Sequence, residues 1–104
     1  MEKDFEVKKD GSVLTVALGE ELATGNAPAL MEELIAYQGQ GVEKVVFDAK
    51  NLKHLSSSGV RVIIYCRKKL SVNPEIVFVD CNNVILDVLD IVGIRPFITF
   101  LKSE

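Results

Sequence analysis

The sequence predicts a single α/β domain over residues 1–104, in which three main helices pack against a mixed sheet of four or five strands. Two observations lead to this prediction. Short runs rich in β-branched residues alternate with longer segments of helical spacing, and glycines and prolines mark the boundaries between them. The composition, with 48% hydrophobic and 26% charged residues, is typical of a globular chain that can bury one core.

The chain opens with a predicted β-hairpin. Phe5 and Val7 are two residues apart, so their side chains point to the same side of a short first strand. Asp10 and Gly11 form a dipeptide that favours a tight turn. The β-rich run of residues 13–18 follows it and predicts an antiparallel partner strand.

A first helix is predicted over residues 27–38. Asn26 is a residue type favoured at the N-cap, and Pro28 falls in the first turn, where its missing N–H costs little. Apolar residues then recur at helical spacing until Gly39, which ends the helix.

Two continuous apolar runs predict strands that are buried on both faces. They cover residues 45–47, ending at Asp48, and residues 76–79, ending at Asp80. Such runs are typical of parallel strands inside a sheet, because neither face alternates with polar residues. A last strand is predicted over residues 97–101.

Two further helices separate these strands. One spans residues 57–70, and the other spans residues 83–92, with Asn82 or Asn83 as its N-cap and Gly93 as its end. The element order is therefore β-β-α-β-α-β-α-β. This order requires parallel strands joined by helices after the opening hairpin. Three helices leave much of one sheet face uncovered.

The charge of the chain argues against several kinds of partner. The net charge of −3 and the pI of about 5.2 make binding to nucleic acid unexpected. The basic residues Arg61, Arg67, Lys68 and Lys69 are interpreted as the solvated face of one helix. No apolar run approaches the roughly 18 residues of a membrane span, and the first residues lack a secretion-signal pattern. The sequence therefore predicts a cytoplasmic protein without direct membrane insertion.

The sequence predicts no enzyme, no metal site and no cofactor. His54 is the only histidine, and it lies near Ser57 without a nucleophile-elbow motif or a third orienting group. Phosphate-loop and dinucleotide-binding fingerprints are absent, and acidic residues show no metal-ligand spacing. Cys66 and Cys81 lie in apolar segments and are interpreted as reduced, buried residues.

Residues 56–58 are three serines, followed by Gly59, at the start of the second predicted helix. Two interpretations of this run stay open. One serine can be a simple N-cap, with Gly59 allowing close packing. Alternatively, the run is a phosphorylation site, because helix N-termini favour negative charge and a phosphate adds about −1.5 to −2 charges.

Several runs together resemble the signature of the STAS domain of anti-sigma factor antagonists. Residues 45–48 are similar to the buried strand that ends in aspartate in that family. Residues 55–60 are similar to the following Asp-Ser-Ser-Gly-Leu or Asp-Ser-Ser-Gly-Val segment, which opens a helix. Residues 19–22 and 26–30 look like the family's Gly-Glu-Leu-Asp and Asn-Ala-Pro region, and residues 88–94 look like its third helix and closing glycine. The resemblance spans nearly the whole chain and implies a single STAS-like domain.

The resemblance also implies a function. Such proteins bind an anti-sigma factor that is often also a serine kinase, and so free the sigma factor. The kinase phosphorylates the first serine after the aspartate, the phosphorylated form dissociates, and a serine phosphatase resets the switch. Aligned on Ser-Ser-Gly, the phosphorylated serine is Ser57. Ser56 replaces the family's aspartate, which makes Ser56 the rival acceptor.

The residues expected to bind the partner surround this run, because ligands and partners meet α/β sheets at strand carboxyl ends and helix N-termini. They are Asp48, Leu52, Leu55, Ser56, Ser57, Ser58, Gly59 and Arg61.

Two alternative functions stand beside this one. The chain could be a cytosolic STAS subunit of a membrane system that transports phospholipids or anions, without a phosphoswitch. It could also be a small hydrolase that uses Ser57 and His54. The sequence predicts no oligomeric state.

Overall fold

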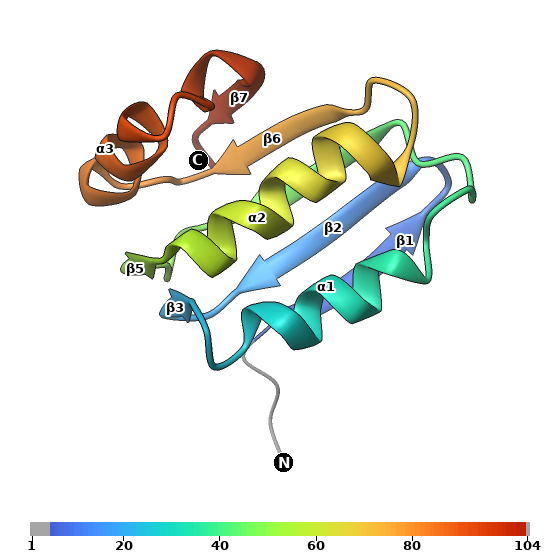
Figure 1. Ribbon diagram of the computed structural model, residues 1–104. Helices are drawn as coiled ribbons and strands as arrows, with labels where there is room; N and C mark the ends of the chain where they lie inside the picture. Colours follow the sequence, from blue (N-terminus) through green and yellow to red (C-terminus); the bar gives the residue numbers. More distant parts are fainter. Residues whose placement is uncertain (1–4, 104) are drawn as a thin grey trace.

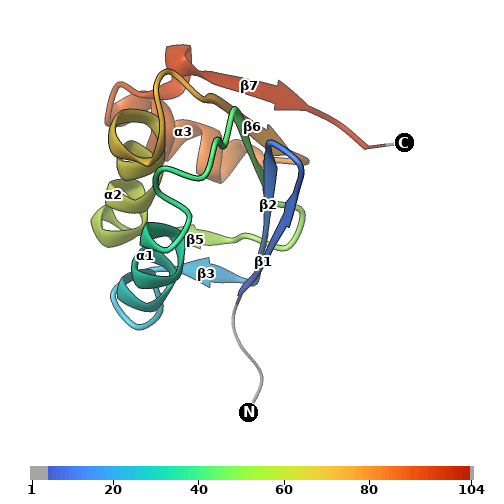
Figure 2. The same cartoon turned by 90° about the vertical axis from the view of Figure 1, so that its right-hand side faces the viewer.

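Residues 5–103, the part of the chain that the computed structural model describes, form a five-stranded mixed sheet with three α-helices on one side of it (Figures 1 and 2). This arrangement confirms the predicted fold class. In spatial order the strands are β1 (Phe5–Asp10), β2 (Val13–Leu18), β4 (Lys44–Asp48), β6 (Glu75–Val79) and β7 (Ile98–Leu101).

The strand pairing follows the predicted order. β1 and β2 pair antiparallel and turn at Gly11, whose φ of +62° lies in the left-handed region that glycine adopts easily. β2, β4, β6 and β7 pair parallel. Parallel neighbours need crossover connections, which here contain the helices. Because parallel strands share one carboxyl edge, the segments that follow β2, β4 and β6 leave the sheet at that edge.

The three helices differ from their predicted bounds mainly at their carboxyl ends. α1 is Ala27–Ile35, and α3 is Asn83–Ile91. The first helix ends before Gln38 because hydrogen bonds between residues three apart tighten the chain there, as from the Tyr37 N–H to the Leu34 carbonyl. α2 is Ser57–Tyr65 and continues as a π-helix, Cys66–Leu70, so the predicted helical span of residues 57–70 is confirmed.

Three short elements were not predicted from the sequence. β3 (Glu21–Leu22) and β5 (His54–Leu55) form a separate parallel pair, and a 3₁₀ turn covers Arg95–Phe97. The 3₁₀ turn contains Pro96, so the last strand begins at Ile98 and not at residue 97. Two-residue strands leave no periodic signal in a sequence, because only their long-range hydrogen bonds define them.

The core lies between the helices and one face of the sheet. Alternate residues of each strand point into it, which is the expected consequence of the two-residue period of a strand. The strand side chains buried there include Leu14, Val16, Val45, Phe47, Ile76, Phe78 and Ile98, and those from the helices include Leu30, Leu34, Val62, Ile63, Ile85 and Leu89.

No helix formed by residues 5–103 covers the opposite face of the sheet, as the three-helix count predicted (Figure 2). Val46 pairs with Thr15 and Val77 on this face and is partly exposed. The prediction that residues 45–47 are buried on both faces is therefore wrong for Val46. The run is continuous in sequence, but only Val45 and Phe47 face the helices.

Asn26 stands at the N-cap position of α1, but its side chain does not cap the helix. The amide is buried and forms hydrogen bonds with backbone groups that precede it in the chain. Its Oδ1 accepts a hydrogen bond from the Ala23 N–H at 2.9 Å, and its Nδ2 donates to the Glu21 carbonyl at 2.8 Å. Asn26 therefore holds the loop that carries β3, and the predicted capping bond is wrong. Of the two N-cap candidates for α3, Asn82 is the one that caps the helix. Its Oδ1 accepts a hydrogen bond from the Ile85 N–H at 3.0 Å.

Both cysteines are free thiols. Cys66 is buried as predicted, whereas Cys81 is only half-buried. Burial raises the pKa of the Cys66 thiol to about 12 and that of Cys81 to about 11. Both groups are therefore protonated near neutral pH.

Candidate functional site

The serine run lies where α2 begins, at the carboxyl edge of the parallel strands (Figure 1). Ser56 is the N-cap of this helix. Its extended backbone lets Oγ accept a hydrogen bond from the Ser58 N–H at 3.2 Å, and its carbonyl accepts from the Val60 N–H at 2.9 Å. Serine and aspartate are about equally favoured as N-caps. The serine that replaces the family's aspartate therefore preserves the cap.

Ser57 is the first residue inside the helix, and its side chain is exposed. Within residues 5–103 its hydroxyl makes no hydrogen bond. Ser58 is half-buried, and its Oγ lies 3.4 Å from Oγ1 of Thr24. The three adjacent serines thus have different environments, and only Ser57 presents an uncommitted hydroxyl to solvent.

Gly59 brings α2 into close contact with the β3–β5 pair. A Cβ atom at this position would lie 2.4 Å from the Leu22 carbonyl oxygen and 2.7 Å from Cδ1 of Leu55. The Leu22 carbonyl also accepts a hydrogen bond from the Ser56 N–H at 3.1 Å. The helix start is therefore fixed by a backbone contact that only glycine permits.

Leu52 and Leu55, which the sequence placed among the partner-binding residues, are core residues. Leu52 is 0% exposed and Leu55 is 9% exposed. The Leu52 carbonyl accepts a hydrogen bond from Nδ2 of Asn82 at 2.8 Å, which ties the loop to the start of α3. Their expected place at the surface is wrong, because both side chains complete the core beneath the loop.

The strand register places the Asp48 side chain on the other side of the sheet from the serines. It pairs with Ala17 and Val79, so it belongs to the face opposite the helices. Its Oδ1 accepts a hydrogen bond from the Lys50 N–H at 3.2 Å, and its Oδ2 lies 3.9 Å from the Lys50 ammonium. Asp48 therefore shapes the turn after β4 and does not join the cluster around Ser57.

Arg61 is exposed one turn after the serine run and borders a shallow groove between α1 and α2. This groove has a volume of about 140 Å³. Its lining residues are Ala27, Pro28, Met31, Ser58, Arg61 and Val62. The α1 residues were missed from sequence, because nothing local indicates which helix lies beside the serines.

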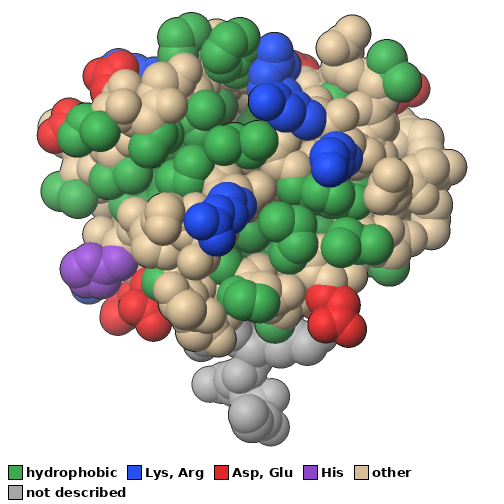
Figure 3. All heavy atoms as spheres, in the orientation of Figure 1, with side chains coloured by type: hydrophobic (Ala, Val, Ile, Leu, Met, Phe, Trp, Pro, Cys, Tyr) green, Lys and Arg blue, Asp and Glu red, His purple; other side chains and the backbone are tan. Residues whose placement is uncertain are grey.

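Basic and apolar side chains share the surface on the helix side. Over this face, Lys and Arg side chains stand between hydrophobic areas, while acidic side chains lie toward the edges (Figure 3). Arg61, Lys68 and Lys69 are exposed, as predicted for a solvated helix face. Arg67 differs from that prediction, because it is half-buried with its guanidinium 4.2 Å from the centre of the Phe97 ring.

The described chain shows no catalytic constellation around the serines. His54 is exposed on β5, and no hydrogen bond links it to Ser57 within residues 5–103. The same range contains no group of three His, Cys, Asp or Glu side chains placed to hold a metal ion. None of the helices described is both long and apolar enough to cross a membrane. The arrangement can present a surface to a partner, and the Ser57 hydroxyl is exposed on it.

Comparison with known sequences identifies relatives over nearly the whole chain. Residues 4–104 match the STAS domain family. BtrV of Bordetella bronchiseptica, which is named as an anti-sigma factor antagonist, is 32% identical over 98 residues. That match covers 93% of this chain and 84% of BtrV.

Solved structures share the fold at low sequence identity. The unphosphorylated form of the anti-sigma factor antagonist SpoIIAA is 14% identical, with a TM-score of 0.78 over 92% of this chain and 86% of that one. The phosphorylated form of SpoIIAA from Bacillus gives a TM-score of 0.70 at 14% identity, over 92% and 89%. A STAS domain protein from Planctomyces limnophilus is also 14% identical, with a TM-score of 0.83 over 100% and 93%.

Proposed function

This chain belongs to the STAS domain family, and on that premise we propose that it acts in the cytoplasm by binding an anti-sigma factor, which frees a sigma factor for transcription. The relatives named above are regulators that act on another protein, which agrees with the prediction that the chain is a binding module and not an enzyme. The relationship to BtrV supports this partner class, because it extends over most of both chains.

We further propose that phosphorylation of Ser57 switches the protein off. The anti-sigma factor itself, acting as a serine kinase, adds the phosphate, and a serine phosphatase removes it. The observation that carries this proposal is the difference between two neighbouring hydroxyls. The Ser57 hydroxyl is exposed and uncommitted, whereas the Ser56 hydroxyl accepts the capping hydrogen bond of α2. A kinase can reach Ser57 without breaking the cap.

The start of α2 is well suited to carry a phosphate. The first N–H groups of a helix have no intrahelical partner, and its N-terminus favours negative charge. Arg61 lies four residues after Ser57, so its exposed guanidinium is within the range of helical side-chain pairing. Phosphorylation would therefore leave the fold intact and add about −1.5 to −2 charges to the surface beside Arg61.

Release of the partner follows from the cost of burying that new charge. We propose that the anti-sigma factor covers Ser57, Ser58 and Arg61 together with the groove between α1 and α2. A partner surface formed around a neutral hydroxyl would offer no counter-charge of its own, and the single charge of Arg61 cannot balance the roughly −1.5 to −2 charges of a phosphate. Burying an unmatched charge costs about 2–5 kcal/mol. The loss corresponds to roughly a thirtyfold or larger decrease in affinity.

The test combines identification of the partner with calorimetry. The protein is used to capture its partner from native cytosol, and mass spectrometry identifies both the partner and any phosphorylated serine. The captured anti-sigma factor is then titrated with wild type, Ser57→Ala, Ser57→Asp and Ser56→Asp. We expect Ser57→Ala to bind like wild type and Ser57→Asp to bind about thirtyfold more weakly.

Ser56→Asp is the matched control, because aspartate keeps the N-cap and adds the same charge one residue away. A loss of binding in Ser56→Asp alone would make Ser56 the acceptor. Wild-type affinity of Ser57→Asp would contradict the switch. Capture of permease and ATPase subunits instead of an anti-sigma factor would favour the transport-subunit alternative.

A further inference from the structure

A second concave site lies at the other end of the α2 helix, away from the serines. It is a pocket of about 280 Å³ between the carboxyl half of α2, the π-helix, β6 and the 3₁₀ turn before β7. Five isoleucines and Phe97 line it, and Arg67 and Lys68 complete the lining. We call it the isoleucine pocket. Neither the serine run nor Arg61 contributes to it.

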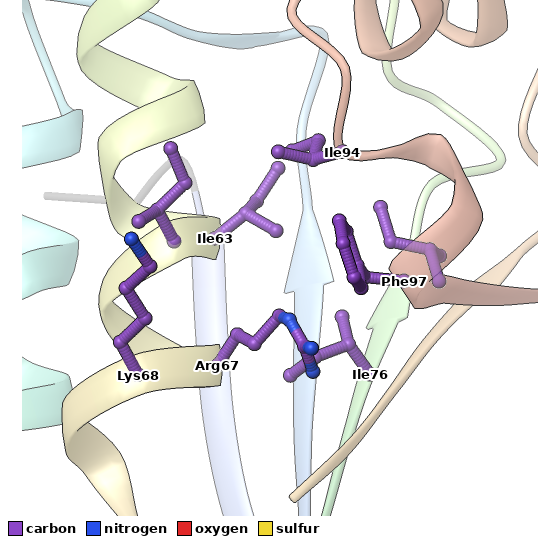
Figure 4. A pocket seen from close by; sticks show the side chains of 8 residues that line it. Ile63, Arg67, Lys68, Ile76, Ile94 and Phe97 are labelled. Carbon is purple, nitrogen blue, oxygen red and sulfur yellow. The ribbon is translucent and has the colours of Figure 1, made fainter. Parts of the chain in front are cut away.

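The two cations reach the pocket at different places, because the Lys68 nitrogen points away from the Arg67 guanidinium (Figure 4). Ile63 and Ile94 approach each other at one end, while Arg67 extends from the helix toward Phe97 and Ile76 at the other (Figure 4). The apolar surface has the chemistry of an aliphatic binding site. Its volume is slightly below the roughly 300–1,000 Å³ of drug-sized ligand sites, so it suits a short chain.

Within the described part of the chain, the two cations of the isoleucine pocket have no acidic partner. No carboxylate lines the pocket, and among residues 5–103 neither Arg67 nor Lys68 forms an ion pair. The Arg67 guanidinium lies 4.2 Å from the centre of the Phe97 ring. Stacking occupies the flat face of a guanidinium and leaves the N–H donors at its edge free. Phe97 therefore positions Arg67 without neutralising it.

The backbone of this wall is also unusual. Residues Cys66–Leu70 form a π-helix that carries both cations. π-helical turns are rare and occur frequently at functional sites. The pocket, the unpaired cations and the π-helix are three separate observations at one place.

We propose that the isoleucine pocket binds a small amphipathic carboxylate, with a short aliphatic chain among the isoleucines and its carboxylate at Arg67. The charge complementarity selects an anion over an alcohol or an amine of the same chain length. The apolar lining selects an aliphatic chain over a free inorganic anion.

Sodium octanoate is the probe, and the binding is followed by ¹⁵N–¹H correlation spectra of the full chain. We expect saturable shifts of the amides of Ile63, Ile94 and Phe97. Octanol should bind about tenfold more weakly, because it lacks the charge-assisted hydrogen bonds. Octylammonium should produce no saturable shift at these amides. Arg67→Gln should weaken octanoate binding about tenfold and leave octanol binding unchanged.

Lys69→Gln is the matched control, since Lys69 is exposed on the same π-helix and does not line the pocket. It should bind octanoate like wild type. The unchanged binding of octanol to Arg67→Gln shows that this variant still forms the pocket. Equal affinities for octanoate and octanol, or an equal loss in both variants, would overturn the proposal. It would also fail if only raising the protein concentration shifted these amides, because the pocket would then be a contact between two copies.

Discussion

Gly59 offers a direct test of how the start of α2 is held in place. In a Gly59→Ala variant the new methyl group would lie 2.4 Å from the Leu22 carbonyl oxygen. That oxygen belongs to the backbone and accepts a hydrogen bond from the Ser56 N–H, so it cannot shift alone. Overpacking costs about 3 kcal/mol at the upper end of its usual range, and the helix propensity of alanine offsets about 1 kcal/mol. We expect the free energy of unfolding to fall by about 2 kcal/mol.

Urea unfolding followed by circular dichroism measures this loss as a lower midpoint with an unchanged slope. For a domain of this size, the same loss lowers Tm by roughly 8–16 °C. Gly25→Ala is the matched control, because a Cβ atom there would meet nothing within 4 Å. Its stability should stay within about 0.5 kcal/mol of wild type. Wild-type stability of Gly59→Ala, or an equal loss in Gly25→Ala, would refute the close-packing argument.

Three further predictions concern the caps and the thiols. Ser56→Ala should lose about 1 kcal/mol of unfolding free energy through its N-cap, while Ser57→Ala should stay within about 0.5 kcal/mol. The reverse order in urea titrations would contradict the capping assignment. Asn82→Ala should lose about 1–2 kcal/mol, because its amide both caps α3 and bonds to the loop after β4; unchanged stability would show that neither bond matters. In native protein at pH 8, Ellman's reagent should modify half-buried Cys81 faster than Cys66, whose pKa of about 12 keeps it protonated. Rapid modification of Cys66 would disprove its burial, and urea should make both thiols reactive.

The phosphoswitch and the isoleucine pocket occupy opposite ends of the helical segment formed by α2 and the π-helix. The serines lie at the start of α2, and the pocket lies along its carboxyl half. The two proposals can therefore be tested separately. Ser57→Asp should not change octanoate binding, and Arg67→Gln should not change the site of phosphorylation.

The sequence by itself determined the order of the main elements and the place of the serine run. The hairpin turn at Asp10 and Gly11, the helix start at the serines and the glycine after α3 are local signals, because a turn or a cap depends on only a few adjacent residues. The family signature added the expectation of a phosphorylated serine at the start of a helix. The mixed sheet with one uncovered face followed from the count and order of these elements.

Only the tertiary structure decided what each residue of the site does. Ser56 and Ser57 are the same residue type in adjacent positions, and the phase of the helix separates a cap from an exposed hydroxyl. Leu52 lies in a loop and Leu55 in the two-residue strand β5. Either apolar side chain could equally cover a core or face a partner, and long-range packing buries both. Asn26 differs, since its amide bonds to backbone groups three and five residues earlier in the chain and not to the helix it precedes.

The isoleucine pocket shows why some features can be predicted from the sequence and others are decided only by the tertiary structure. Its walls come from α2, β6 and the 3₁₀ turn before β7, which the sheet topology brings together from three separate parts of the chain. In the sequence, Arg67 and Lys68 are two charges on a helix, and the isoleucines are ordinary core candidates. Local patterns report hydrogen bonding and burial within one element. A concave surface arises only when elements distant in sequence are packed against one another.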